Sequence, residues 1–249
     1  LGAECHWVED AREATDLYLE LKPDWVVFGT YFNYLDEVHR HSKTAHINHG
    51  IGSKSCYYHD SSTPMTVRFM EGSLRLEKIR ELYPDDLFTQ VGFSKLDPLF
   101  NDQEPGLDYP GLGLDPARQT ILYAPTFNPS SLERFPDDWP ADFDQYNILI
   151  KPHFLSYARK RYKKHRQKMQ SWARFDNVYV AGEEEFSLLP FMKDADVLLS
   201  EASSTLFEFA ALGRPVIVCN FFKLKFFYRG LFRYRFERRF RRDNVLFDD

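Results

Sequence analysis

The stretch from Asp194 to Phe221 constrains the fold of this chain more than any other part of the sequence. It opens with the short apolar run Val197–Leu199, which is typical of a fully buried parallel strand. A helix is expected over Thr205–Leu212, Gly213 supplies its C-terminal stop, and Val216–Val218 is expected to be a second buried strand. A strand–helix–strand unit this compact predicts a parallel sheet with a right-handed crossover.

Three hydroxyl residues, Ser203, Ser204 and Thr205, stand at the turn between the first of these strands and the helix. Any of them can cap the helix by accepting a bond from a backbone N–H group. A helix N-terminus also carries unpaired N–H groups and a partial positive charge, so this turn is a candidate anion site. Glu208 lies one turn beyond Ser204, where its carboxylate can accept bonds from ribose hydroxyls. The alternative interpretation is a capped helix with an exposed glutamate.

The rest of the chain repeats the alternation of strands and helices. Apolar runs that end in a glycine or a proline, such as Trp25–Gly29 and Thr120–Pro125, alternate with segments of helical spacing such as Glu9–Leu21. The segment 101–118, rich in proline and glycine, separates about three strands from at least four more. We therefore predict an α/β protein with two lobes and parallel sheets. The predicted domains are an N-terminal lobe at 1–104, a C-terminal lobe at 119–222 and a tail at 223–249.

A histidine follows one strand of the first lobe. The strand Thr44–Asn48 leads into His49 and a turn that contains Gly50 and Gly52 and ends at Lys54. Ligands of open α/β sheets bind where a strand ends, and glycines permit close backbone approach. The alternative interpretation is a glycine turn that happens to follow a histidine. The other histidines of this lobe lack the paired spacing of structural zinc sites, and we predict no metal.

Polar residues also follow two strands of the second lobe. The strand at 120–126 ends in Pro125 and Thr126, and the strand Tyr146–Ile150 leads into Lys151 and His153. These residues and the hydroxyl turn are expected at the carboxyl edge of one sheet, because parallel strands end on the same side.

The charge of the chain is unevenly distributed. The net charge is −5, yet seven Lys and Arg residues fall within 159–168 and nine within 223–242. The first group lies in a segment, Leu155–Arg174, that is expected to be one long helix, and such a run is usually a solvated helix face. A second helix is expected over Phe186–Met192.

Composition excludes several classes of protein. With 43% hydrophobic and 28% charged residues among 249, the chain has the composition of a globular protein. Three scattered cysteines suggest neither a disulfide framework nor a zinc site, which favours a reducing compartment. No apolar run approaches the ~20 residues of a membrane span, and no signal peptide is recognised. The chain begins at Leu1, so we expect a fragment of a longer protein.

Five strings in the right order resemble the glycerophosphotransferase family of teichoic acid and capsule synthesis. They are Asn48–Lys54, Val91–Asp97, Ile121–Phe127, Ile150–His153 and Asp194–Phe221. The family uses CDP-glycerol or CDP-ribitol and has a two-lobed GT-B fold, and here the first lobe is short or truncated by comparison. Three positions depart from the family pattern: Asn128–Pro129 where an arginine is usual, Glu201–Ala202 in place of Asp-Tyr, and Glu208 in place of an aspartate.

The resemblance implies a role for each candidate residue. The C-terminal lobe would hold the CDP-alcohol, with the pyrophosphate against Ser203 and Ser204, a bond from the catalytic residue His153 and the ribose on Glu208. His49 would be the general base that takes the proton of the acceptor hydroxyl, a role that suits an imidazole. The remaining residues that the resemblance assigns to the donor are Gly50, Lys54, Pro125, Thr126, Lys151 and Thr205. No cofactor is implied.

The predicted function is transfer of a glycerol-phosphate or ribitol-phosphate unit from a CDP-alcohol to a hydroxyl of a cell-surface polymer or its lipid-linked primer, with release of CMP. One alternative is another GT-B enzyme, either a nucleotide-sugar glycosyltransferase or a UDP-sugar 2-epimerase. A second alternative is a non-catalytic domain that keeps the fold, which the short first lobe favours.

The tail interleaves basic and aromatic residues between 221 and 242, with Glu237 as its only acid. Such a segment suits an anionic membrane surface, whereas the acidic remainder of the chain argues against nucleic acid. The alternative is a final helix packed across both lobes. Because the acceptors of the family are lipid-linked polymers, we expect a cytoplasmic protein held peripherally on the inner face of the plasma membrane.

Overall fold

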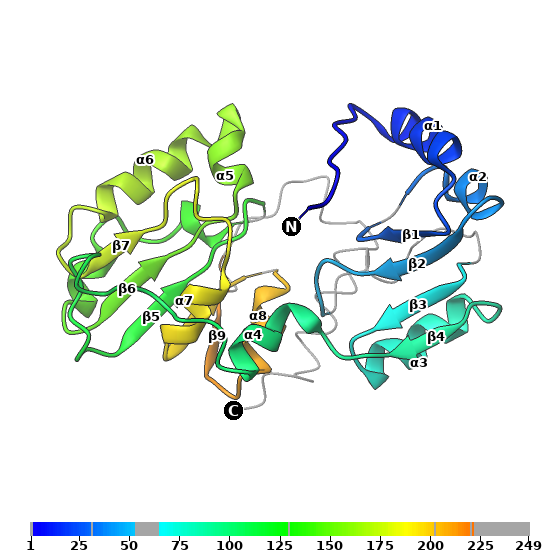
Figure 1. Cartoon of the computed structure of the whole chain (residues 1–249). Helices are drawn as coiled ribbons and strands as arrows, with labels where there is room; N and C mark the ends of the chain where they lie inside the picture. Colours follow the sequence, from blue (N-terminus) through cyan, green and yellow to red (C-terminus); the bar gives the residue numbers. More distant parts are fainter. Residues whose placement is uncertain are drawn as a thin grey trace. The chain divides into compact units, whose positions relative to one another are not determined.

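The computed structural model describes residues 2–30, 32–52, 65–128, 130–201, 203–219 and 221. The predicted donor residue Lys54 and the predicted tail at 223–249 lie outside these residues. The chain divides into two compact units, Leu1–Ser94 and Lys95–Asp249. Each unit contains one parallel sheet (Figure 1), which confirms the predicted α/β class.

The sheet of the first unit has four parallel strands in the order β1-β2-β3-β4. The strands are β1 (Trp25–Phe28), β2 (Lys43–Ile47), β3 (Val67–Met70) and β4 (Phe88–Gln90). Strand β3 was not predicted, because Arg68 interrupts its apolar run. The Arg68 side chain is fully buried and forms an ion pair with Asp86, so the strand is interior despite its charge.

Three helices of the first unit pack on one face of this sheet. They are α1 (Ala11–Leu21), α2 (Leu35–His39) and α3 (Ser73–Leu82). Helices α1 and α2 contribute to the cluster around Val26 and Phe28, and α3 packs against Met70 and Phe88. The strand register places these four side chains on the same face. Helix α1 begins at its N-cap Asp10, whose carboxylate accepts two backbone N–H bonds.

The second unit has a five-stranded parallel sheet in the order β7-β6-β5-β8-β9. Its strands are β5 (Thr120–Tyr123), β6 (Asn147–Ile150), β7 (Val178–Val180), β8 (Val197–Ser200) and β9 (Val216–Val218). Its helices are α4 (Asp97–Phe100), α5 (Leu155–Ala158), α6 (Lys163–Trp172), α7 (Leu189–Asp194) and α8 (Thr205–Ala210). Every residue of β5 and β6 is buried, as expected for central strands covered on both faces.

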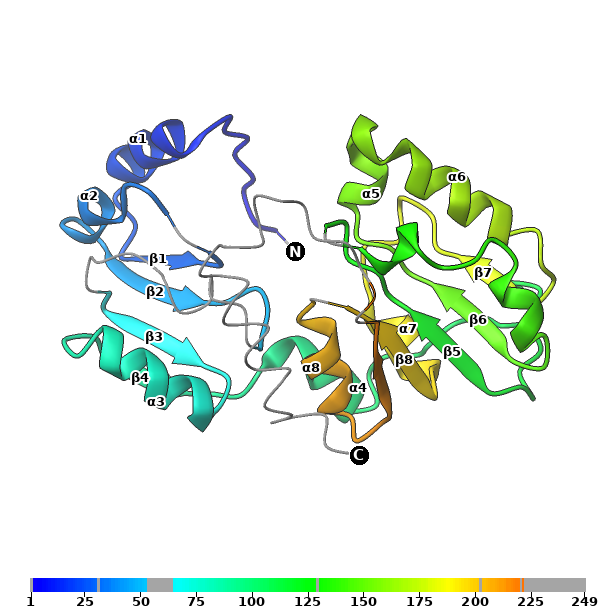
Figure 2. The same cartoon turned by 180° about the vertical axis from the view of Figure 1, so that it is seen from behind.

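Helices cover the two faces of this sheet (Figure 2). On one face, Tyr123 and Ile150 pack with Trp139 and with Met169 and Trp172 of the α6 segment. On the other face, Phe191 of α7 stacks against Tyr179 at 6.4 Å between ring centroids.

The long helix predicted over 155–174 is in fact two helices. Arg159 has extended backbone angles (φ −99°, ψ 124°), and the 3₁₀ turn η5 (Lys160–Tyr162) joins α5 to α6. The guanidinium group of Arg166 donates to the carbonyls of Ser156, Tyr157 and Arg159 at 2.7–3.1 Å, and these bonds stabilise the break. The helix predicted over 186–192 begins later, with Pro190 in its first turn.

The segment 101–118, predicted as the linker, packs on the second unit. The hydroxyl of Tyr109 lies 2.9 Å from the Thr120 hydroxyl, and the Leu107 N–H donates to the Asp194 carboxylate at 2.6 Å. Gly106 has φ +84°, and a Cβ there would lie 2.5 Å from Asp194 Oδ1, so this close approach requires glycine. The two compact units accordingly divide at Ser94, while the predicted domain limits stay predictions.

In the part of the chain that the structure describes, no helix combines the length and apolar content that a membrane crossing requires.

Candidate functional site

The carboxyl edge of the second sheet gathers most of the residues predicted to form a site. Pro125 and Thr126 follow β5, Lys151 and His153 follow β6, and the hydroxyl turn follows β8. Strands β6 and β7 lie on one side of β5, whereas β8 and β9 lie on the other. The junction of β5 and β8 is therefore the topological switch point, which is where open α/β sheets bind ligands.

Buried hydrogen bonds hold the switch point together. The Ser200 hydroxyl donates to the Ala124 carbonyl at 2.6 Å. The fully buried carboxylate of Glu201 accepts bonds from the Thr126 N–H at 3.1 Å, the Ser131 N–H at 3.0 Å and the Ser131 hydroxyl at 2.7 Å. Glu201 thus ties the segment that follows β5 to the end of β8 and fixes the backbone around Thr126.

Glu201 is also the most strongly perturbed acid of the site. Burial raises the pKa of its carboxyl group from 4.5 to about 7, although the bonds from Ser131, Ser130 and Thr126 act in the opposite direction. In the sequence, Glu201 stands out only as a departure from the family pattern. Its partners lie 70 and 75 residues away, so no local pattern could assign them.

At the hydroxyl turn, Ser203 provides the cap. Its Oγ accepts the Thr205 N–H at 3.3 Å and its hydroxyl donates to Thr205 Oγ1 at 3.0 Å. Ser204 is the N-cap residue of α8, but it has helical angles and its side chain makes no capping bond. The Ser204 hydroxyl is therefore not used to cap the helix.

His153 lies exposed at the end of β6. Its backbone N–H donates to the Pro125 carbonyl at 3.2 Å, which links the β6 segment to the β5 segment. Its ring Nδ1 accepts the Leu155 N–H at 3.2 Å, so in the neutral ring the proton is on Nε2. The ring also packs against Phe127 and stacks on Phe154, with centroids 4.7 and 4.9 Å apart.

Lys151 is buried rather than presented to solvent. Only 8% of the residue is exposed, and its ammonium group lies 5.9 Å from the centroid of the Phe191 ring. Burial lowers the pKa of this lysine, and the charge of Glu185 partly offsets that effect. Lys151 belongs to the wall of the site, and its side chain is directed toward the face of the sheet that α7 covers.

Glu208 forms an ion pair that the sequence did not suggest. Its side chain is fully buried, and Oε2 lies 2.7 Å from the Lys95 ammonium group. The second oxygen, Oε1, is buried and has no hydrogen-bond partner among the described residues. The alternative interpretation, in which Glu208 is exposed, is therefore wrong. The predicted contact between Glu208 and the ribose stays a prediction.

His49 belongs to the first unit and follows β2. Its ring Nδ1 lies 2.9 Å from the Gly29 carbonyl oxygen, which can only accept, so Nδ1 carries a proton. In the neutral ring the Nε2 lone pair is then the basic position. The turn continues through Gly50, which is buried, and Gly52, whose φ is +109°.

Solved structures share this fold at low sequence identity. A structure of the wall teichoic acid polymerase TagF soaked with CDPG has a TM-score of 0.54 and 17% identity, covering 78% of this chain and 52% of its own. UDP-N-acetylglucosamine 2-epimerase from Rickettsia bellii has a TM-score of 0.58 and 18% identity, covering 83% and 58%. The UDP-GlcNAc-bound 2-epimerase from Neisseria meningitidis has a TM-score of 0.51 and 16% identity, covering 84% and 62%.

These matches define the chain as a protein of the GT-B-like fold class, as predicted. The chain spans about half the length of the TagF structures it matches. No curated protein sequence matched it. The CDP-glycerol:poly(glycerophosphate) glycerophosphotransferase family matches residues 76–223, more than half of the chain, and the chain belongs to that family.

Proposed function

We propose that this protein transfers a glycerol-phosphate unit, or the related ribitol-phosphate unit, from a CDP-alcohol to a hydroxyl of a cell-surface polymer or its lipid-linked primer. The observation that carries the proposal is the switch-point edge of the second sheet. Thr126, His153 and Ser203 lie there after the ends of three neighbouring strands, inside the stretch that matches the family. A phosphate-bearing nucleotide is the ligand class that such an edge accepts.

The donor would lie with its pyrophosphate beside the hydroxyl turn. His153 would donate from Nε2–H, which the bond between Nδ1 and Leu155 leaves as the protonated position. Ser204 has a hydroxyl that the helix cap does not use. Fixed donors of this kind stabilise charge on a leaving phosphate without reorganisation during the reaction. The remaining proposed donor residues are Gly50, Lys54, Pro125, Thr126, Lys151, Ser203, Thr205 and Glu208.

The proposed chemistry is one substitution at phosphorus. The acceptor oxygen attacks the phosphorus that bears the glycerol unit, a new P–O bond forms, and the pyrophosphate P–O bond breaks so that CMP leaves. His49 takes the proton from the acceptor hydroxyl at Nε2, because the bond to the Gly29 carbonyl occupies Nδ1–H. The acceptor is proposed to be lipid-linked, on the cytoplasmic face of the membrane.

A donor panel tests this proposal. We expect the full chain to bind CDP-glycerol or CDP-ribitol in calorimetry and to release CMP when an acceptor is added. A second candidate, UDP-sugar chemistry, is favoured by the likeness to the 2-epimerases. Binding of UDP-N-acetylglucosamine with no binding of either CDP-alcohol would establish that candidate and overturn the proposal.

A further inference from the structure

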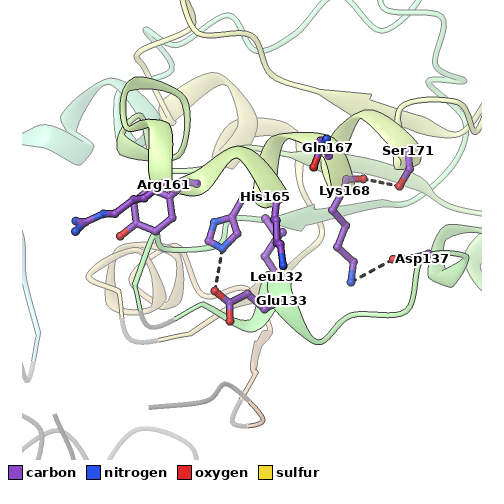
Figure 3. A pocket seen from close by; sticks show the side chains of 10 residues that line it. Leu132, Glu133, Asp137, Arg161, His165, Gln167, Lys168 and Ser171 are labelled. Carbon is purple, nitrogen blue, oxygen red and sulfur yellow. Dashed lines mark hydrogen bonds and ion pairs between the residues drawn. The ribbon is translucent and has the colours of Figure 1, made fainter. Parts of the chain in front are cut away.

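A cavity of about 710 Å³ lies in the second unit, outside the switch-point edge. One wall is α6 with the turn that precedes it, and the other is the segment 132–137 that follows β5 (Figure 3). The turn and α6 contain most of the basic run at 159–168, which was expected to be a solvated helix face.

The helix wall presents a row of cations to the cavity. Arg161 lies in the turn η5, and Lys164 and Lys168, four residues apart, lie on one side of α6. All three line the cavity. Lys168 is already engaged, because its ammonium group bonds to the Phe135 carbonyl and lies 3.3 Å from Asp137. Among the described residues, no carboxylate forms an ion pair with Arg161 or Lys164. The Arg161 guanidinium group lies over the Tyr162 ring, 5.0 Å from its centroid, and this contact leaves its N–H groups able to donate to an anion.

The cavity wall also contains a polar group that the protein does not satisfy. His165 is 3% exposed, and its Nε2 lies 3.2 Å from Glu133 Oε1. Its Nδ1 is buried and has no hydrogen-bond partner among the described residues. Because a carboxylate only accepts, Nε2 is the donor, and Nδ1 of the neutral ring is an acceptor. This bond holds the Glu133 carboxylate, whose side chain is 60% exposed, at the cavity wall.

A row of aromatic rings joins this cavity to the switch-point edge within the same unit. The ring of His165 stacks on Tyr162 with centroids 5.0 Å apart, and Tyr162 lies edge-on to Phe127 at 6.0 Å. Phe127 in turn packs against His153 at 4.7 Å. An extended ligand in the cavity would thus be separated by three ring contacts from His153, the residue proposed to donate a hydrogen bond to the phosphate.

We infer that this cavity binds a phosphodiester-linked polyol chain, the acceptor class of the proposed function on which this inference rests. Arg161 and Lys164 would bind phosphate oxygens, and the exposed carboxylate of Glu133, held by His165, would accept bonds from hydroxyls. The carbon chain would pack on Leu132 and Tyr162, which also contribute to the cavity. An anionic membrane surface is a poorer occupant, because the surface of a bilayer cannot enter a cavity between two segments of the protein, whereas a single extended chain can.

The test compares two double variants, each of which removes two positive charges. Arg161→Ala/Lys164→Ala removes the two available cations of the cavity, whereas Lys160→Ala/Lys163→Ala removes two exposed cations of the same turn and helix that do not line it. The probe is a synthetic oligo(glycerol phosphate), measured by calorimetry with the full chain. We expect the cavity variant to lose about tenfold or more in affinity, since charge-assisted bonds to phosphate are lost, and the control to lose much less.

An equal loss of oligomer affinity in both variants would mean that the oligomer is bound by non-specific charge attraction, and this would overturn the inference. Loss of binding to phosphatidylglycerol vesicles in the cavity variant, with oligomer binding unchanged, would assign the cations to a membrane and overturn it as well. CDP-glycerol affinity is measured in parallel. Normal donor binding without oligomer binding contradicts this inference alone, whereas oligomer binding without donor binding contradicts the proposed function alone.

Discussion

The ammonium group of Lys95 lies 2.7 Å from the carboxylate of Glu208, 113 residues later in the chain. The carboxylate is fully buried, whereas the lysine side chain is 41% exposed. Lys95 belongs to one of the five strings that suggested the family, and Glu208 belongs to another. The contact therefore ties the start of the second unit to α8, whose N-terminus carries the hydroxyl turn.

Lys95→Met is expected to destabilise the fold. The substitution leaves the Glu208 carboxylate buried without its counter-ion. We expect the free energy of unfolding to fall by about 1–3 kcal/mol, which is less than for a fully buried ion pair because the lysine is partly exposed. Urea unfolding measures the change. Lys193→Met is the matched control, because Lys193 pairs with the exposed carboxylate of Asp102 at 2.9 Å and should change little. Equal effects of the two substitutions would contradict the structural role.

Glu201 is expected to make stability depend on pH. Its pKa is raised in the fold to about 7, so the folded chain binds more protons than the unfolded chain between pH 4.5 and 7. Stability is therefore highest below this window and falls as pH rises through it, by about 3 kcal/mol for this group. Glu201→Gln keeps the acceptor oxygen and removes the titration. Urea unfolding at pH 5 and 8 should show a smaller decline in the variant, and parallel pH curves would exclude the assignment.

Ser203→Ala and His153→Ala are expected to weaken binding or turnover of the CDP-alcohol. Each substitution removes a hydrogen bond that the residue is proposed to donate to the pyrophosphate. Loss of one such donor typically costs about 10²–10³ in rate. Ser187→Ala is the control for Ser203, since the Ser187 Oγ accepts the Leu189 N–H at 3.2 Å at the start of α7, another six-residue helix. Both serine variants lose the same kind of cap. Unchanged kinetics with CDP-glycerol in Ser203→Ala and His153→Ala would remove these residues from the donor site.

The sequence predicted most strands from short apolar runs, whether or not the strand is buried on both faces. The apolar runs around Leu122 and Leu149 became β5 and β6, which are buried on both faces as central parallel strands should be. The runs of β8 and β9 were also predicted, but β8 alternates between buried and half-buried residues and Ile217 of β9 is 55% exposed. Strand β3 was missed because the ion pair with Asp86 makes burial of Arg68 possible, and a partner 18 residues away leaves no local pattern.

The sequence predicted only those features of the site that depend on residues close together in the chain. The strand ends at Thr126, His153 and Ser203 follow from short motifs, and the sheet order brings them to one edge. The bonds that fix them are long-range, such as those of Glu201 with Ser131, and no periodicity encodes such pairs. The break between α5 and α6 was missed for the same reason, because it depends on where the Arg166 side chain folds back.

The tail at 223–249, which lies outside the described residues, is expected to bind anionic membranes. Its nine Lys and Arg residues fall within 223–242, and each basic residue near an anionic surface contributes about 1 kcal/mol. Binding to phosphatidylglycerol vesicles in co-sedimentation should decrease with salt and disappear when 223–249 are removed. Equal binding by the truncated protein, or no binding by either protein, would reject the prediction.

His49→Asn is expected to abolish transfer while leaving the affinity for CDP-glycerol largely unchanged. The asparagine amide can still donate to the Gly29 carbonyl, so the bond that Nδ1 makes at 2.9 Å is preserved while the basic nitrogen is lost. Single-turnover release of CMP measures transfer, and calorimetry measures donor affinity. His41→Ala, which removes an exposed imidazole of the same unit, is the control and should keep full activity.

In the wild type the pH–rate profile should have an acidic limb, because the protonated imidazole cannot act as a base. A collapse of donor affinity in His49→Asn would make His49 a donor ligand, and an acidic limb that persists in this variant would exclude it as the base.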